Sequence, residues 1–491
     1  MNNKGQTTIF FSLIISVLLL FTLTALEVGR IYMSRVKVGA VVHSARSSIM
    51  ADYNSELFER YHLLFMDPTY GTGSEAALEE KITDYLEGSL NGENGKGSGI
   101  YQFQVEEISL ADKTGILDEN MEQLKEQIVE YEKTAGVVRK AENLAKQLDG
   151  KQANLEGAAR ETEVNGVEME TADAGTDNTA EGNPDIEVTD PRDTLKDALK
   201  LGTLSFVMPG NITLSKKEYD FGKSPSVEYS EQLEEEKDNH FQDIGFLKGF
   251  LKDSAQEKSY SGLEKQAAFI DYASSHFSNG VTQKEASIMK CELEYILKGK
   301  SSDYDNLQGV INEITWLRMP VNYAYLLSDT EKKSAALTLA AAICTATGTE
   351  AFIEVVKYLL LGCWAYGETL CEMRTLLEGG QIAYVKTKET WNTDLKNLAA
   401  GNSAKKADTG LSYEDYLMLL LAKKGEKQQD LCYARMLDVI ELNLKEEDPD
   451  FQITNCVGKL IIQGKVSVNS LFIKGKDGTN YEVCFEEEIA Y

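Results

Sequence analysis

The stretch IFFSLIISVLLLFTLTALEVGRIY, residues 9–32, decides how the chain is organised. Its first part, Ile9–Leu26, carries no charge. As an α-helix rising about 1.5 Å per residue, this run is about 27 Å long, enough to cross the hydrocarbon core of a bilayer. A removable secretory signal has a shorter apolar region of roughly 7–15 residues and then a small-x-small cleavage site. The residues that follow this run contain no such cleavage site, so the sequence favours a retained membrane helix over a cleaved signal.

The orientation of this helix follows from the length of what lies on each side. Basic residues flank it at Lys4 and at Arg30, Arg35 and Lys37, and Glu27 offsets the second group, so flanking charge gives no clear direction. Only a short head precedes the run, and long domains cross largely regardless of flanking charge. We therefore expect a single-pass protein of the cell membrane, with a cytoplasmic amino terminus and an extracytoplasmic body.

The composition narrows the classes of partner. The chain has 491 residues, 79 acidic against 50 basic, and a net charge of −29. Nucleic-acid binding needs clustered Lys and Arg to replace counterions, so this charge argues against a nucleic-acid partner. The seven cysteines form no C-x-x-C pair and the four histidines are far apart, so we expect no metal site and no cofactor.

The residues after the membrane run continue its helical pattern. No proline occurs before Pro68, so one helix can extend over about residues 8–54. A membrane helix followed by a separate amphipathic helix fits the same residues. Farther on, residues 74–90 predict a helix with Ser74 as its N-cap, and the alternating residues 101–111 predict a strand.

An acidic segment interrupts the chain after a further predicted helix at residues 117–148. Glu161–Asp193 holds eleven acidic residues, one basic residue and no aromatic residue, a composition typical of a flexible linker. We divide the chain into a cytoplasmic head (1–8), a transmembrane helix (9–26), a proximal helical stalk with a small α+β region (27–150), the acidic linker (151–195), a helical extracytoplasmic domain (196–447) and carboxyl-terminal strands (448–491).

The distal part is mostly helical. Residues 226–448 contain one proline, Pro320, and show helical periodicity. Ala351–Glu378 is expected to be a central buried helix that Gly379 and Gly380 terminate. The short apolar run Leu204–Met208 predicts a strand.

The carboxyl end changes from helical to alternating periodicity. Residues 448–491 predict two or three antiparallel strands, with Lys476-Asp477-Gly478 in turn position. The expected fold class is α+β, predominantly helical.

Catalytic motifs are missing from the sequence: no phosphate-binding loop, G-x-S-x-G or H-E-x-x-H occurs. The sharpest polar feature is a pair of carboxylates, Glu368 and Glu372, one helical turn apart and near Arg374 on an otherwise apolar helix. Such a pair can serve as general acid and base. The structural alternative is that they pair with Arg374, Lys386 or Lys388, and we favour it. We expect no enzymatic activity.

The amino terminus resembles the pseudopilin-like proteins of Tad (tight adherence) pilus systems. The larger proteins of that type carry a patch similar to D-V-G-R-x-Y after the apolar helix, and Glu27-Val-Gly-Arg-Ile-Tyr32 stands in this position, with Gly29 and Arg30 at its centre. The resemblance implies cleavage by a prepilin peptidase between Gly5 and Gln6. The fifth residue of the product would then be Phe10, where type IV pilins generally have Glu.

Most of the remaining chain resembles an uncharacterised family of long, single-pass exported proteins from anaerobic Gram-positive bacteria. The matching stretches are ADYNSELFERYHLLF (51–65), KEQIVEYEK (125–133), KCELEYILKGK (290–300), GCWAYGETLCEMRTLLEGG (362–380) and GLSYEDYLMLLL (410–421). The two resemblances together imply a structural component of a Tad-like pilus or an associated secretion assembly, which acts through protein–protein contacts. A membrane-tethered surface module that binds cell-wall or peptide ligands is the alternative.

Overall fold

The computed structural model describes residues 4–92, 100–136, 202–210, 212, 214–231, 260–285, 287–395, 398, 410–472 and 480–491. The chain divides into two compact units. Unit 1 comprises Met1–Gln127, Ser224–Leu233 and Ile440–Tyr491, and unit 2 comprises Ile128–Lys223 and Glu234–Val439. The predicted acidic linker, most of the second half of the helix predicted at residues 117–148, and the predicted turn at residues 476–478 lie outside the described residues.

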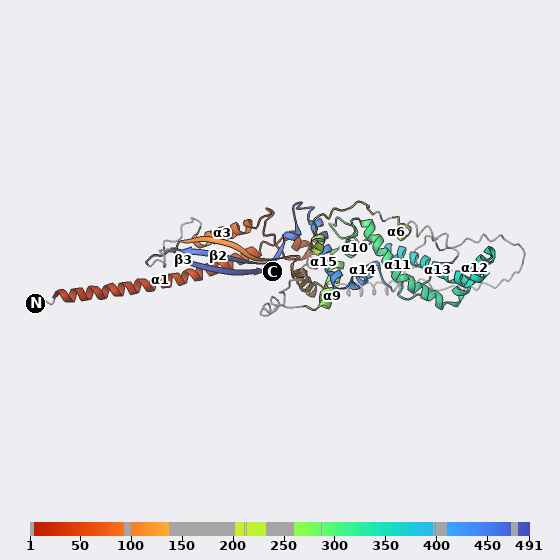
Figure 1. The fold of residues 1–491 in the computed structure, drawn as a ribbon, viewed down its shortest axis with the longest axis horizontal. Coiled ribbons are helices and arrows are strands. Elements are labelled where there is room, and N and C mark those ends of the chain that lie inside the picture. Colours follow the sequence, from red (N-terminus) through yellow and green to blue (C-terminus); the bar gives the residue numbers. More distant parts are fainter. Residues whose placement is uncertain are drawn as a thin grey trace, which may run out of the picture. The chain divides into compact units, whose positions relative to one another are not determined.

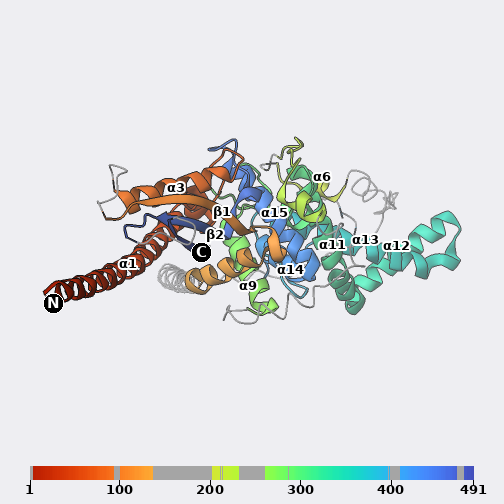
Figure 2. The same cartoon turned by 60° about the vertical axis from the view of Figure 1, so that its left-hand side comes forward.

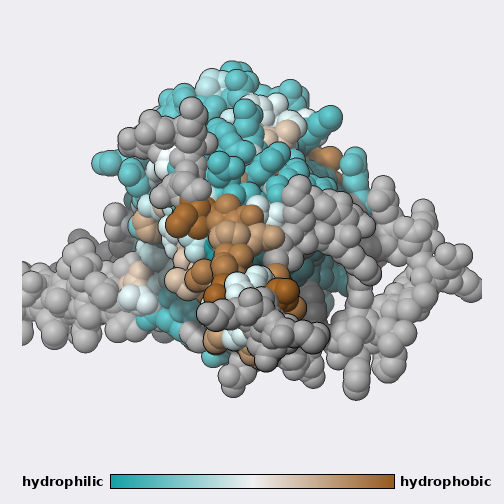
Figure 3. Space-filling view, turned by 90° about the vertical axis from the view of Figure 1, so that its left-hand side faces the viewer, coloured by the Kyte–Doolittle hydropathy of each residue, from teal (hydrophilic) through white to brown (hydrophobic). Residues whose placement is uncertain are grey.

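Unit 1 begins with α1 (Lys4–Met50), a continuous helix of 47 residues (Figure 1). The prediction of a single helix is therefore correct, and the alternative of two separate helices is wrong. Among the described residues, α1 is the one helix long and apolar enough to span a membrane, and none of its most apolar 18-residue window is buried. In the view from the amino-terminal side, hydrophobic residues lie together in the middle of the face turned toward the reader (Figure 3).

Two further helices follow α1 in unit 1. Asn54 caps α2 (Ser55–Tyr61) by accepting a hydrogen bond from the Leu57 amide at 2.8 Å. The predicted helix near residues 74–90 is α3 (Ala76–Asn91). The N-cap position is Glu75, one residue after the predicted Ser74, and the Glu75 side chain makes no capping hydrogen bond. The Ser74 hydroxyl does accept a hydrogen bond from the Ala76 amide, at 3.3 Å. The apolar face of the helix is buried along its whole length.

A three-stranded antiparallel sheet completes unit 1. Its order is β1 (Phe103–Gly115), β2 (Val457–Val468), β3 (Tyr481–Ala490), so β2 pairs with a strand from the first quarter of the chain on one side and with β3 on the other (Figure 2). The register aligns Phe103 with Val468 and Gly115 with Val457. The predicted strands are confirmed, and β1 is longer than the sequence pattern indicated.

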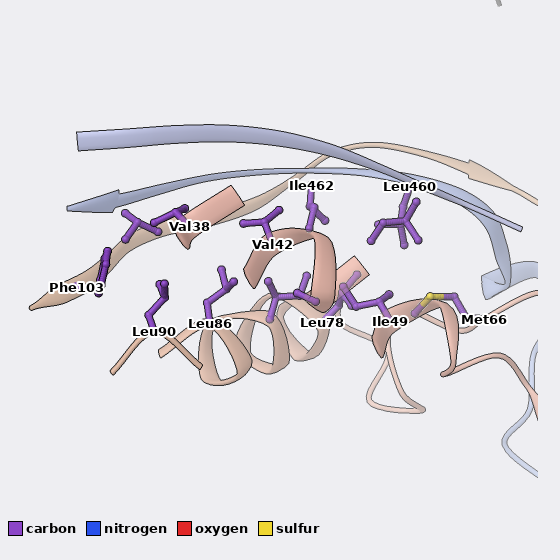
Figure 4. Close-up of a cluster of buried hydrophobic side chains, with 14 of the residues drawn as sticks. Val38, Val42, Ile49, Met66, Leu78, Leu86, Leu90, Phe103, Leu460 and Ile462 are labelled. Atoms are coloured by element: carbon purple, nitrogen blue, oxygen red, sulfur yellow. The ribbon is translucent and has the colours of Figure 1, made fainter. Parts of the chain in front are cut away.

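The core of unit 1 lies between the sheet and two helices, α1 and α3. Figure 4 shows side chains from both helices directed toward β2. The second half of α1 contributes one residue per turn to this core, because residues on one helical face recur every three or four positions. The buried cluster contains Val38, Val42, Ala45, Ile49, Met66, Leu78, Ile82, Leu86, Leu90, Phe103, Val457, Leu460, Ile462, Val466, Val468 and Ile489.

Unit 2 is built of helices in the residues that the structure describes. They are α6 (Thr203–Val207), α9 (Gly262–His276), α10 (Glu292–Lys298), α11 (Asp303–Ser328), α12 (Thr330–Thr347), α13 (Ile353–Leu377), α14 (Tyr413–Ala422) and most of α15 (Glu426–Leu444). The strand predicted at 204–208 is wrong, because these residues form α6 and bury Leu204 and Val207. Its apolar run is too short for periodicity to separate a strand from a buried helix.

Helix α13 is the segment expected to be central and buried, and it is mostly buried from Leu360 onward but mostly exposed in its first two turns. Val355, Tyr358 and Leu359 are exposed, whereas nearly every residue from Leu360 onward is buried. The helix ends at Leu377, and Gly379 adopts a φ of +75°, a conformation that favours glycine.

Candidate functional site

The predicted patch after the apolar run contains a buried ion pair. Glu27 and Arg30 lie one turn apart on α1, and both side chains are almost fully buried. Arg30 Nη2 lies 2.7 Å from Glu27 Oε1, and Nε lies 3.3 Å from Oε2, so the pair is bidentate. This geometry fixes both side chains more strongly than a single contact would.

The pair also binds backbone groups at one end of the sheet. Arg30 Nη1 donates to the carbonyl of Ile100 at 3.2 Å, and Arg30 Nη2 donates to the carbonyl of Asn469. In turn, Glu27 Oε1 accepts from the Leu471 amide at 3.2 Å. We call Glu27, Arg30 and these three backbone partners the helix–sheet clamp. It fixes the rotation and axial position of α1 at the point where its apolar run ends.

The other patch residues face away from the clamp. Apart from the adjacent turns of α1 itself, no atom of the described residues lies within 4 Å of the position that a Cβ on Gly29 would occupy. Tyr32 is exposed. The predicted patch therefore divides into a buried charged half that holds the sheet and an exposed half that makes no such contact. Gly5 and Gln6, the predicted processing site, lie in the first turn of α1.

The two predicted carboxylates belong to a second buried polar network, in unit 2. Lys386 Nζ bridges Glu368 Oε1 at 2.6 Å and Glu372 Oε1 at 2.8 Å. Arg318, from α11, forms a bidentate pair with Glu372 at 2.7 and 3.0 Å. Thr393 donates to Glu368 from both its amide, at 2.9 Å, and its hydroxyl, at 2.8 Å.

This arrangement determines the charge state of Glu372. Burial alone would raise the pKa of its carboxyl, but the hydrogen bonds and charges of Arg318 and Lys386 outweigh burial and hold the pKa below its usual value. An ionised carboxylate with every strong partner in place is suited to holding segments together. The predicted structural role, pairing with Lys386, has the geometry it requires.

Two of the predicted pairings are wrong, and one partner was missed. Arg374 donates to the carbonyl of Phe206 at 2.8 Å, and Lys388 pairs with Glu331 at 2.9 Å. The residue that pairs with Glu372 in their place is Arg318, 54 positions earlier in the chain. No spacing pattern links residues this far apart, so the sequence offered no signal for this pair.

The network supports an exposed apolar surface in unit 2. Arg318 also donates to the carbonyls of Ala383 and Tyr384, which fixes the segment that presents Tyr384 and Val385 to solvent. Trp316, on the same helix as Arg318, is 72% exposed. Beside them a shallow groove of about 500 Å³ is lined by Pro320, Val321, Ala324, Tyr325, Ser328, Val385 and Lys386.

No group of three or more His, Cys, Asp or Glu side chains among the described residues is arranged to hold a metal ion. All seven cysteines are free thiols, and five of them are buried.

The comparison with protein families identifies this chain. The model of a family described as a family of unknown function (DUF5702) matches residues 181–468, more than half of the chain, so the chain belongs to this family. The matched range contains all of unit 2's described helices from α6 onward, and it reaches β2 of unit 1. No curated protein and no solved structure matches the chain.

Proposed function

We propose that this member of the DUF5702 family is a membrane-anchored, extracytoplasmic structural component of a Tad-like pilus or an associated secretion assembly. In this proposal, Ile9–Leu26 crosses the cell membrane once, with the amino terminus in the cytoplasm. The body acts through protein–protein contacts rather than catalysis.

The observation that carries the proposal is the division of α1 into two halves. The first half is apolar and exposed on all sides, whereas the second half lies in the core of unit 1. A helix that is apolar all round needs an apolar environment such as a membrane or neighbouring helices. Because α1 has no break between the halves, any force on the embedded half passes directly to the folded unit. A structural component that anchors or joins an assembly needs such a connection.

The exposed apolar surface of unit 2 supports contacts with other proteins. Trp316, Tyr384 and Val385 are all more than half exposed. For the two aromatic side chains this is unusual, because Trp and Tyr generally bury most of their surface. Exposed patches of this kind mark interaction surfaces. Aromatic residues are also enriched at the energetically important centres of protein interfaces.

Mass spectrometry of the native amino terminus tests the proposal. A mature chain that begins at Gln6 supports processing of the pilin type. An intact Met1 supports a plain anchor and removes the support for pilus incorporation. A chain that begins well beyond Leu26 contradicts both.

The groove in unit 2 favours a second candidate function, a membrane-tethered surface module that binds a cell-wall or peptide ligand. The groove is mostly apolar and has Lys386 at its edge. Binding of peptides and cell-wall fragments to the full chain in nanodiscs, compared with a variant of two groove-lining residues, Val321→Asp/Val385→Asp, distinguishes this candidate. A ligand that binds the parent chain and not the variant favours it.

A further inference from the structure

Three exposed apolar side chains that do not belong to α1 lie at one end of unit 1. Ile100 is 57% exposed, Leu471 is 44% exposed and Phe472 is 52% exposed. Ile100 precedes β1, and the other two residues follow β2, so the chain brings them together from distant positions. Exposed Leu, Ile and Phe side chains in one place call for a physical explanation.

The helix–sheet clamp determines where these residues lie along α1. Arg30 binds the carbonyl of Ile100, and Glu27 binds the amide of Leu471 at 3.2 Å. Glu27 directly follows Leu26, the last residue of the apolar run. Because a helix rises about 1.5 Å per residue, the residues from Glu27 to Arg30 cover only about 5 Å along the axis. The backbone of Ile100 and of Leu471 therefore lies at the level where the membrane-spanning run ends.

We propose that Ile100, Leu471 and Phe472 insert into the interfacial layer of the lipid bilayer and seat the end of the sheet on the membrane. The inference rests on the proposed function in one respect, namely that Ile9–Leu26 spans a membrane. The clamp residues satisfy one another within the protein, so this end of unit 1 does not expose the charges of Glu27 and Arg30 to lipid.

We choose lipid as the partner that covers these three side chains because they lie beside the helix that is proposed to cross the membrane. The backbone groups of Ile100 and Leu471 are hydrogen-bonded to Arg30 and Glu27, on the turn of α1 that directly follows the apolar run. A partner that covered these side chains would therefore have to lie at the level of the lipid headgroups. Aromatic and apolar side chains are favoured at this depth, where Trp and Tyr belts form. A seated sheet would make a second contact with the membrane and thereby set the direction in which unit 1 leaves it.

Tryptophan substitution tests this inference in the full chain. The three native tryptophans, Trp316, Trp364 and Trp391, all belong to unit 2, so their emission can be measured in the wild type and subtracted. We would compare Phe472→Trp and Ile100→Trp in vesicles of ordinary phosphatidylcholine and phosphatidylglycerol with vesicles whose acyl chains carry bromine, which quenches tryptophan on contact. Both positions are exposed, so the substitutions leave the core unchanged.

Two matched substitutions serve as controls. Phe21→Trp lies inside the apolar run, and Tyr70→Trp lies at the other end of unit 1, where Tyr70 bonds Asp52 just beyond the end of α1. We expect strong quenching at position 21, clear quenching of at least about one third at positions 472 and 100, and none at position 70.

The outcomes separate the two proposals. Quenching at 21 with none at 472 and 100 overturns the seating of the sheet and leaves the anchor intact. The absence of quenching at 21 overturns the anchor itself. A blue-shifted but unquenched emission at 472 shows that a second copy or another protein covers this surface, which also overturns the inference.

Discussion

The clamp in unit 1 and the network in unit 2 both bury acidic and basic side chains, but they are built differently. In the clamp, the two charges are three residues apart on one helix, and they bind backbone groups of the rest of the unit. In the network, the carboxylates of α13 bind a lysine and an arginine from two other segments. The two charges of the clamp balance each other within α1. The charges of the network balance only when three segments of the chain have come together.

This difference predicts what happens to each region when one of its charged partners is removed. Losing one partner of a buried network leaves an uncompensated charge inside the protein, which costs far more than the pair contributes. Removing Arg30 from the clamp also leaves the buried Glu27 carboxylate without its cation, but only one charge and a few backbone groups are affected, at the end of unit 1. Damage to the network should therefore unfold unit 2, and damage to the clamp should loosen α1 from the sheet.

The largest effect is expected from Arg318→Met. Glu368 and Glu372 would then share the single charge of Lys386, and we expect unit 2 to lose about 3–5 kcal/mol of unfolding free energy. Trp364 and Trp391 are buried in unit 2, so their fluorescence during urea unfolding measures this loss.

Two control variants test the cause. Arg318→Met/Glu372→Leu removes the whole pair and should recover most of the lost stability, because apolar replacement of a complete buried pair is often neutral. Lys388→Met breaks an exposed pair with Glu331 and should change nothing measurable. A double variant as unstable as the single one would show that the charge of Glu372 is not the cause.

Glu294 extends the comparison to the effect of pH, because within the described residues its buried carboxyl is not paired with a cation as those of Glu27 and Glu372 are. Glu294 is fully buried, and burial raises its pKa to about 7, although hydrogen bonds from Tyr413 and the Gly280 amide act against the rise. The folded state therefore holds a proton that the unfolded state releases above its ordinary pKa of 4.5. The contribution of Glu294 to stability should therefore be most favourable below about pH 4.5 and fall as the pH rises to about 7, by about 3 kcal/mol in total.

The variant Glu294→Gln measures this contribution. Glutamine cannot ionise, so the difference in unfolding free energy between wild type and variant should itself fall by about 3 kcal/mol between pH 4.5 and pH 7.5. Glu372 has the opposite sign: its lowered pKa adds stability above its ordinary range and loses it on acidification. Parallel stability curves for wild type and Glu294→Gln would contradict the assignment.

Breaking the clamp should have a smaller and more local effect. In Arg30→Met, the carbonyls of Ile100 and Asn469 lose their donor and Glu27 loses its cation, which we expect to cost about 2 kcal/mol. Hydrogen exchange measured by mass spectrometry should show faster exchange in residues 100–104 and 466–472. Arg35→Met, a basic residue on the exposed face of α1, is the matched control. Equal protection in both variants would show that the clamp does not hold the sheet.

The sequence predicted the features that depend on neighbouring residues. The length of α1 was readable because its apolar residues repeat at helical spacing without a proline, and the last strands were readable from their alternation. The pairing of β1 with β2 was not, because Phe103 and Val468 lie more than 360 residues apart. The five-residue run of α6 was misread for a different reason, since a run that short has no period to distinguish.

The two charged regions show the same limit. Glu27 with Arg30, and Glu368 with Glu372, are each visible as residues one turn apart on a helix. Their partners are not, because a backbone carbonyl such as that of Asn469 carries no sequence signal, and Arg318 looks like any other arginine in an amphipathic helix. A local pattern identified which residues were special, and the folded chain determined what they bind.

The smallest change within the chain comes from Gly29→Ala, which tests the exposed half of the patch. Among the described residues beyond the adjacent turns of α1, no atom lies within 4 Å of a Cβ at this position. Alanine favours a helix over glycine, so α1 should gain up to about 1 kcal/mol of local stability. Slower hydrogen exchange around residues 27–34 in nanodiscs would show this gain. In cells, the amount of protein that sediments with large assemblies should be unchanged if this face contacts lipid alone. A loss of sedimentation without loss of folded protein would show that a partner helix approaches Gly29 closely, which would place an assembly contact on the side of α1 opposite to the clamp.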